Sequence, residues 1–295
     1  MYRTWVIARH TFTEAVLQPI YSLMILLGAA VLAVFGGLPF FTFGEDTLMF
    51  TSVSLDVILL FVLISTLFVT SRSIYEEIED RTMLTLMSKP VARWEVMVGK
   101  YAGIIAAAAL AMAALAVVLA LATWWRIPTD YQIRAATVSD VEARNLWETR
   151  MMHLAGLVPS IVVIWLQVCV LAAIGVAIST RFSLVVNLPT VIIIYFAGNL
   201  IRFLPEVATG VLTKGLLYLS YLLPFLSVFD LKSQAVLSPI ALPGTQFEGQ
   251  FNAVSLGFLW TNVALAALYA ATYATFALAL GLYFFRHREL GGSEG

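Results

Sequence analysis

Long apolar runs, separated by shorter polar or charged segments, make up most of this 295-residue chain. A transmembrane helix needs about 20 apolar residues to cross a hydrocarbon core of about 30 Å. Six runs reach that length, and they cover residues 20–42, 53–72, 102–123, 154–179, 184–203 and 258–285. The pattern predicts an all-α, polytopic membrane protein with six transmembrane helices, in a single domain over residues 1–295.

The first polar segment, residues 2–18, has an amphipathic pattern. Trp5, Ala8 and Phe12 recur at helical spacing and form an apolar face, as in helices that lie in the membrane interface. Pro19 ends or turns this helix, because proline lacks a backbone donor. We expect an interfacial N-terminal helix, with a plain extension of the first span as the alternative. The segment is too amphipathic for a typical cleaved leader, so we expect it to be retained.

Two of the segments between spans are long, and we expect both outside the cell. In the first, residues 126–153, Ser139 and Glu142 match a capping box. The helix that they begin is expected to continue into the fourth span. The second, residues 204–257, contains the short apolar run 216–229. We expect a helix pair on the outer leaflet or dipping into it, with a seventh crossing as the alternative.

Lysine and arginine near the span ends set the expected orientation. With the N-terminus inside, ten of these residues lie on the cytoplasmic side and seven outside, although the outside loops are much longer. Arg181, Arg286 and Arg288 weigh most, because they lie directly beside span ends. We therefore expect both termini in the cytoplasm and the chain in the plasma or inner membrane, in contact with lipid.

The densest run of charge is the cytoplasmic segment 74–101. Ionised side chains at the bilayer centre cost about 2.5–3.5 kcal/mol each, so this segment leaves the membrane. Its first part has a helical pattern in which Glu77 and Arg81 pair one turn apart. Pro90 suits the first turn of a second helix. The pattern predicts two short amphipathic helices joined by a rigid elbow, typical of a docking element, with a solvated connector as the alternative.

The same segment carries a family resemblance. It reads YEEIEDRTMLTLMSKPVARWEVMVGKYAG and is similar to the cytoplasmic loop of type-2 ABC transporter permeases, approximately E-x-E-x-R/G-T-x-x-L-L-S-K-P-V-S-R followed by G-K. Met87 and Ala92 depart from this pattern, where leucine and serine are commoner. The order of an interfacial helix, six spans and a tiny second cytoplasmic turn also resembles this family. Within it, the chain resembles the permeases of nitrous-oxide-reductase maturation systems.

The resemblance implies that segment 74–101 is a coupling helix that docks onto a separate ABC ATPase subunit. The residues that it implies at or beside this contact are Glu77, Glu79, Arg81, Thr82, Ser88, Lys89, Pro90 and Arg93. The turn Ser179–Ser183 offers a second cytoplasmic contact through Thr180 and Arg181. The chain has no G-x-x-x-x-G-K-[ST] loop. We therefore expect no cofactor and no enzyme activity in this chain, with ATP and Mg²⁺ bound by the partner subunit.

Polar and small residues inside the spans suggest helix packing. Gln167 and Asn187 are expected to form interhelical hydrogen bonds, with the lining of a substrate path as the alternative. Gly99 and Gly103 form a G-x-x-x-G at the start of the third span. This spacing favours close packing within the bundle or, alternatively, a dimer seam.

Composition narrows the classes of function. The chain is 61% hydrophobic and 12% charged, against about 25% charged residues in soluble domains. Its net charge of −1 gives no reason to expect nucleic acid as a partner. A single cysteine, Cys169, excludes an intrachain disulfide. The three histidines are far apart along the chain, so no metal site is predicted.

These features predict the membrane-spanning permease subunit of an ATP-driven transporter. We expect an exporter that acts as a homodimer or heterodimer with a second permease copy. Two alternatives belong to other classes: a membrane anchor that recruits a cytoplasmic partner without transport, and a secondary transporter driven by an ion gradient.

Overall fold

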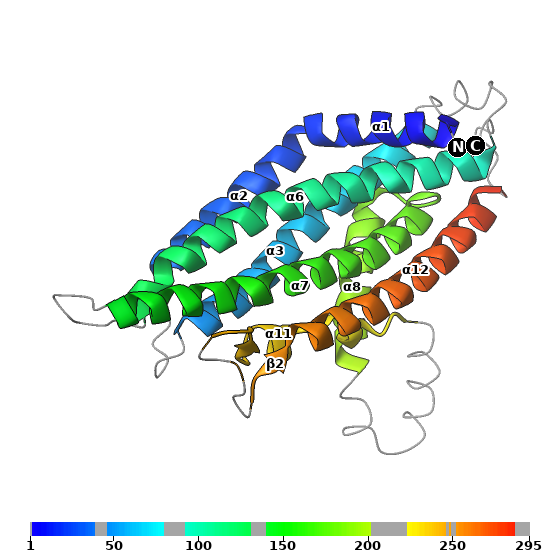
Figure 1. Cartoon of the computed structure of the whole chain (residues 1–295). Helices are drawn as coiled ribbons and strands as arrows, with labels where there is room; N and C mark the ends of the chain where they lie inside the picture. Colours follow the sequence, from blue (N-terminus) through cyan, green and yellow to red (C-terminus); the bar gives the residue numbers. More distant parts are fainter. Residues whose placement is uncertain are drawn as a thin grey trace, which may run out of the picture.

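The computed structural model describes residues 2–38, 46–79, 92–130, 140–201, 223–245, 248 and 252–286. Long helices that lie side by side make up most of it (Figure 1). In chain order the elements are α1 (Tyr2–Leu17), α2 (Pro19–Gly37), α3 (Asp46–Ser71), η1 (Arg72–Glu76), α4 (Glu77–Glu79), α6 (Arg93–Asp130), α7 (Asp140–Ser179), α8 (Leu184–Leu200), η3 (Leu226–Phe229), α11 (Lys232–Ala235), β1 (Ile240–Ala241), β2 (Val254–Ser255) and α12 (Leu256–Arg286). The two short strands pair in parallel.

One end of the bundle gathers the start of α1, the start of α6 and the end of α12 (Figure 1). The backbone of Thr4 in α1 lies against Gly99 in α6, and Arg93 in α6 donates a hydrogen bond to Phe285 in α12. We call this the N/C end, and we call the opposite end, where α6 ends and α7 begins, the far end. The first and last helices of the chain therefore meet on the same side of the bundle.

Among the described residues, five helical stretches are long and apolar enough to cross a membrane. They cover Pro19–Gly37, Thr47–Glu79, Arg93–Ile127, Arg144–Ser179 and Leu256–Phe285. These stretches contain or overlap the first, second, third, fourth and sixth of the predicted spans. The prediction of an all-α, polytopic membrane protein is confirmed.

The fifth predicted span corresponds to the shorter helix α8. Its 17 residues lie at the lower limit of about 17–25 residues for a crossing. α7 ends at the N/C end, where a turn leads into α8. α12 also ends at the N/C end, so it begins at the opposite end. The chain between α7 and α12 therefore has to cross the length of the bundle once. α8 runs in the required direction, because Gly198 near its end packs against Leu226 of η3. A sixth crossing at this position stays a prediction.

Of the two short helices predicted in segment 74–101, the second is not a separate element in the structure. α6 runs without a break over 38 residues, so the second predicted short helix and the third predicted span form one rod. Extending an existing helix by one residue is favourable once its first turn has formed, and the change from charged to apolar sequence does not end it. At the far end α6 and α7 likewise continue into the predicted loop 126–153. The predicted capping residue Ser139 lies outside the described residues.

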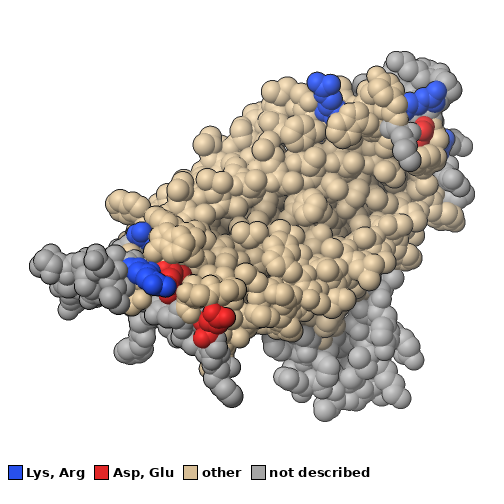
Figure 2. Space-filling model, viewed as in Figure 1, with Lys and Arg blue, Asp and Glu red and all other residues tan. Residues whose placement is uncertain are grey.

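The middle of the bundle is apolar both outside and inside. On the face drawn in Figure 2, the described Lys, Arg, Asp and Glu residues lie toward the two ends, with a broad belt of other residues between them. Inside, α2, α3, α6 and α7 pack around buried side chains that include Leu32, Leu55, Leu115 and Leu157. In a bilayer such packing is stabilised by van der Waals contact rather than by the exclusion of water.

The described part of the predicted outer segment 204–257 packs against the bundle. The backbone N–H of Phe225 donates to the hydroxyl oxygen of Tyr269 in α12 at 2.8 Å. The carbonyl group of Ala235 lies so close to Gly156 in α7 that a Cβ atom would not fit there. These contacts attach the segment to two different long helices.

An ion pair attaches the same segment to a third helix. Lys232, the first residue of α11, pairs with Asp56 of α3. Of the helix pair that the sequence predicts here, the structure describes the short 3-10 helix η3, whereas residues 204–222 lie outside the described part of the chain. The small parallel strand pair was not predicted.

Candidate functional site

A π-helical turn interrupts the helix that ends at the N/C end. α3 finishes at Ser71, the five residues of η1 follow, and α4 continues to Glu79. A π-helical turn shifts the hydrogen-bond register of a helix, is one cause of kinks and is frequent at functional sites. It comes directly before residues 80–91, which lie outside the described part of the chain and hold most of the predicted coupling contact.

Lys100 of α6 holds this turn from one side. Its Nζ atom lies 2.6 Å from Oε1 of Glu77, and it donates to the carbonyl oxygen of Ser73 at 2.7 Å and to Ser73 Oγ at 3.2 Å. The lysine is only 4% exposed. A buried ammonium group is costly unless acceptors surround it, and removal of one partner leaves an uncompensated charge. The three contacts therefore join α6 to η1 and α4.

A hydrogen-bonded cluster holds the same turn from the other side. Asn187 of α8 donates through Nδ2 to Ser71 Oγ at 2.9 Å and to Ser179 Oγ at 2.8 Å. Ser71 is the last residue before η1, and Ser179 is the last residue of α7. All three side chains are buried. The cluster therefore joins the ends of α3 and α7 to the start of α8.

Arg93 joins the start of α6 to the end of α12. Its Nη1 donates to the carbonyl oxygen of Phe285 at 3.0 Å, and its guanidinium lies 5.4 Å from the centre of the Phe285 ring. The last carbonyl groups of a helix lack intrahelical donors and carry partial negative charge, so a cation is favourable there. We call these three bonded groups together the N/C joint. It consists of Ser71, Ser73, Glu77, Arg93, Lys100, Ser179, Asn187 and Phe285.

Gly99 and Gly103 lie against α1. A Cβ atom at Gly103 would be 2.5 Å from the carbonyl oxygen of Ala8, and one at Gly99 would be 2.9 Å from Cγ2 of Ile7. Any larger residue would push the two helices apart. α1 of the same chain occupies this side of α6, which is the side that a seam between two copies would need.

The residues predicted at the ATPase contact fall into three groups. Those outside the described part of the chain are Arg81, Thr82, Ser88, Lys89 and Pro90. Glu77 and Arg93 belong to the N/C joint, where they bond to other helices. Glu79 is exposed at the end of α4, so its side chain is available to a partner.

The two residues predicted as a second cytoplasmic contact differ in accessibility. Thr180 is buried, and its Oγ1 donates to the carbonyl oxygen of Ala177 at 2.7 Å. Arg181 is exposed, and its guanidinium lies 5.8 Å from the centre of the Phe284 ring. Of this pair, Arg181 presents its side chain at the surface.

Sequence reasoning did not identify the partners of Lys100, nor the roles of Ser71, Ser73 and Ser179. One signal was available: Lys100 stands where an amphipathic pattern passes into a long apolar run, and a lysine at such a position needs acceptors close by. The three serines offer no such signal, because serine is common in helices of every kind. Their roles depend on which helices meet.

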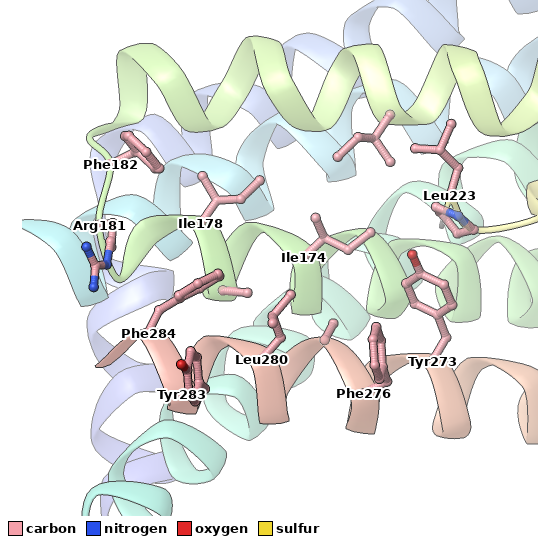
Figure 3. Close-up of a pocket in the computed structure, with 14 residues that line it drawn as sticks. Ile174, Ile178, Arg181, Phe182, Leu223, Tyr273, Phe276, Leu280, Tyr283 and Phe284 are labelled. Atoms are coloured by element: carbon pink, nitrogen blue, oxygen red, sulfur yellow. The ribbon is translucent and has the colours of Figure 1, made fainter. Parts of the chain in front are cut away.

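An apolar groove of about 700 Å³ lies between α7, α8 and α12 (Figure 3). It extends from Arg181, beside the N/C joint, to Leu223 in the outer segment. Neither Gln167 nor Asn187 lines it. Asn187 forms the interhelical hydrogen bonds described above, and Gln167 is buried within α7.

The fold and the N/C joint define a class of protein. It is a polytopic helical membrane protein in which several helix ends are bonded to one another at one end of the bundle. The model of the family described as ABC-2 family transporter protein matches residues 5–290. The chain therefore belongs to the ABC-2 transporter family, which confirms the resemblance to type-2 ABC permeases. The match does not distinguish the nitrous-oxide-reductase maturation subgroup.

Family membership makes the chain a multi-pass membrane transport component rather than an ATPase. Members typically work with an ABC ATPase partner. No curated protein matches the chain.

Proposed function

We propose that this chain is the permease subunit of an ABC exporter, and that the N/C joint couples it to a separate ATPase subunit. The observation that carries the proposal is the position of the π-helical turn η1. η1 lies between α3 and most of the predicted ATPase contact, and Lys100 of α6 donates to the carbonyl oxygen of Ser73 within it. Asn187 bonds to the residue just before it. A displacement of the docking segment would therefore act on several helices at once.

In this proposal the N/C end faces the cytoplasm, where ATP is available to the partner. The excess of lysine and arginine at the short segments of this side supports that orientation. α1 then lies along the inner membrane surface, packed onto α6 through Gly99 and Gly103. Export as the direction rests on the resemblance of segment 74–101 alone. We further propose that two permease copies act together on two ATPase subunits.

The experiment is a purification of the tagged chain with its bound ATPase, followed by reconstitution into liposomes. The double charge reversal Glu79→Arg with Arg81→Glu keeps the net charge but exchanges the two charges within the predicted ATPase contact. We expect it to abolish the dependence of ATP hydrolysis on the permease, while membrane insertion stays normal. Inside-out vesicles should accumulate the substrate only when ATP is present and only when Glu79 and Arg81 are unaltered.

A suitable control is Arg144→Glu, which changes an exposed charge on α7 at the far end. This variant should keep the wild-type ATPase response. Unchanged coupling in the double reversal would refute the proposed contact. A bound partner without ATPase activity would favour a membrane anchor, and transport driven by an ion gradient without any ATPase would favour a secondary transporter.

A further inference from the structure

The groove between α7, α8 and α12 has the shape of a channel along the helices. Figure 3 shows α8 on one side and α12 on the other, with α7 between them and side chains of all three pointing into the groove. Most of the lining is aliphatic or aromatic, for example Ile174, Ile178, Phe276 and Leu280. Its volume of about 700 Å³ falls within the range of sites that hold small ligands.

The length of the groove matches one leaflet of a membrane. Along α12 its lining runs from Phe284 to Tyr273, which is about 16 Å at 1.5 Å per residue. Half of a hydrocarbon core of about 30 Å is about 15 Å. Leu223 of the outer segment lies at the end that is more distant from the N/C end (Figure 3). Pro224, which also lines the groove, lies against Gly198 near the end of α8. The length of the groove is therefore close to the depth of a single leaflet.

The end of the groove at the membrane surface carries a cation. Arg181 lies there with Tyr283 and Phe284 (Figure 3). Its side chain is exposed and, among the described residues, no carboxylate pairs with it. Arginine binds phosphate oxygens with paired donors, and aromatic rings are favoured at the level of lipid headgroups. One end of the groove thus suits an anionic headgroup, and the rest suits hydrocarbon.

We propose that this groove binds an anionic phospholipid from the leaflet at the N/C end. One acyl chain lies along the groove between α8 and α12, and the phosphate group binds Arg181. Assignment of this leaflet to the cytoplasmic side rests on the proposed function, and the binding itself does not. Cytoplasmic leaflets carry the anionic lipids of the membrane, so the charge of Arg181 and the expected orientation agree.

A lipid in this site would fill the groove between α8 and α12 on the surface that faces the membrane. Two helices that meet through a lipid chain separate more easily than two helices in direct contact, because the chain is mobile and exchangeable. The occupant also covers Phe276 and Leu280, which the chain itself leaves exposed. The lipid would therefore fill the space between α8 and α12 without joining the two helices directly.

The headgroup part is tested on the full chain in nanodiscs that contain phosphatidylglycerol and phosphatidylcholine with identical acyl chains. Native mass spectrometry counts the lipids that stay bound during graded delipidation. We expect one tightly retained phosphatidylglycerol per chain. Arg181→Ala should lower the preference for phosphatidylglycerol about fivefold, the factor that corresponds to about 1 kcal/mol per surface cation. Arg181→Lys should keep most of it, and Arg9→Ala on α1 should not change it.

The acyl-chain part is tested with a matched pair of variants on α12. Leu280→Trp fills the groove, whereas Leu268→Trp makes the same change at an exposed position that does not line it. Loss of contact with about two methylene groups should weaken retention about fifteenfold in Leu280→Trp, at about 0.8 kcal/mol each. Leu268→Trp should retain lipid as the wild type does.

Several results would overturn the proposal. Equal retention of both lipids that is insensitive to Arg181→Ala removes the headgroup site. Equal behaviour of Leu280→Trp and Leu268→Trp removes the acyl-chain site. Loss of dimerisation in Leu280→Trp, with lipid retention unchanged, assigns the groove to a second copy of the chain. Loss of transport without loss of lipid assigns it to the substrate. The transport and ATPase results leave the lipid counts interpretable, so failure of the proposed function is distinguishable from failure of the lipid site.

Discussion

Two ion pairs between a lysine and a carboxylate attach polar segments to long helices. One lies at each end of the bundle, and the two differ in burial. At the N/C end, Lys100 and Glu77 have side-chain exposures of 5% and 25%. At the far end, Lys232 and Asp56 have side-chain exposures of 24% and 54%. Lys100 has further acceptors on Ser73. The first pair is therefore part of a buried network, and the second is a surface contact.

The difference suggests different roles for the two ends. Exposed ion pairs typically contribute about 0–1 kcal/mol and weaken with salt, whereas removal of one partner from a buried pair costs about 3–5 kcal/mol. A segment held by an exposed pair can detach and return at little cost. Helix ends held by a buried network move together. The far-end segment is thus attached loosely, whereas the helix ends at the N/C joint are held firmly to one another.

The largest expected effect is that of Lys100→Met. Methionine keeps much of the side-chain length but leaves Glu77 and the carbonyl oxygen of Ser73 without their cation. We expect the free energy of unfolding to fall by about 3 kcal/mol, measured by reversible denaturant unfolding of the purified chain in detergent. The double variant Lys100→Met with Glu77→Gln should recover part of the loss, since it also removes the carboxylate that the ammonium group contacted. Equal stability of the single and double variants would show that the two groups do not interact.

A smaller effect is expected for Asn187→Ala, which removes the hydrogen bonds to Ser71 and Ser179. Interhelical hydrogen bonds in membrane proteins contribute about 0.6 kcal/mol on average and up to about 1.7, so we expect a loss of about 1 kcal/mol. The control is Asn262→Ala, because Asn262 is half-buried and donates within its own helix to Phe258. If both variants unfold alike, the cluster does not hold the π-helical turn.

The smallest effect is expected for Lys232→Met, which makes the same chemical change as Lys100→Met at the other end. The loss should be below about 1 kcal/mol and should shrink further in 1 M salt, because exposed charges are screened. Denaturant unfolding of Lys100→Met and Lys232→Met at low and high salt compares the two losses of unfolding free energy and their salt dependence. A loss that matches that of Lys100→Met and does not respond to salt would place the far-end pair inside the lipid and remove the distinction between the two ends.

The sequence predicts which segments cross the membrane better than it predicts where each helix begins and ends. Hydropathy identifies residues that favour lipid, so the apolar runs emerge clearly. It does not indicate where a helix ends in water, which is why α6 extends beyond its predicted span. The extension of α7 before its span was predicted instead from the capping box. The short strand pair and the packing of the outer segment against Gly156 depend on tertiary contacts, for which no local pattern exists.

The N/C joint was only partly predictable for a related reason. Asn187 was predicted as an interhelical hydrogen-bonding residue, because an amide within an apolar helix needs a partner. The pairing of Glu77 with Lys100 depends on η1, and a π-helical turn shifts the register of every residue after it. Periodicity with 3.6 residues per turn places Glu77 beside Arg81, which lies outside the described residues, and gives no indication of Lys100.

The unbroken length of α6 has a mechanical consequence. Its 38 residues make a rod of about 57 Å, nearly twice the hydrocarbon thickness of about 30 Å. A rod that pivots near the N/C joint would move its far tip by roughly 5 Å for each 5° of tilt, given that length. α3, by contrast, contains a π-helical turn at which it can bend. α6 is therefore long enough that a small tilt at one end of the bundle would give a larger displacement at the other end, whereas α3 has a point at which it can bend.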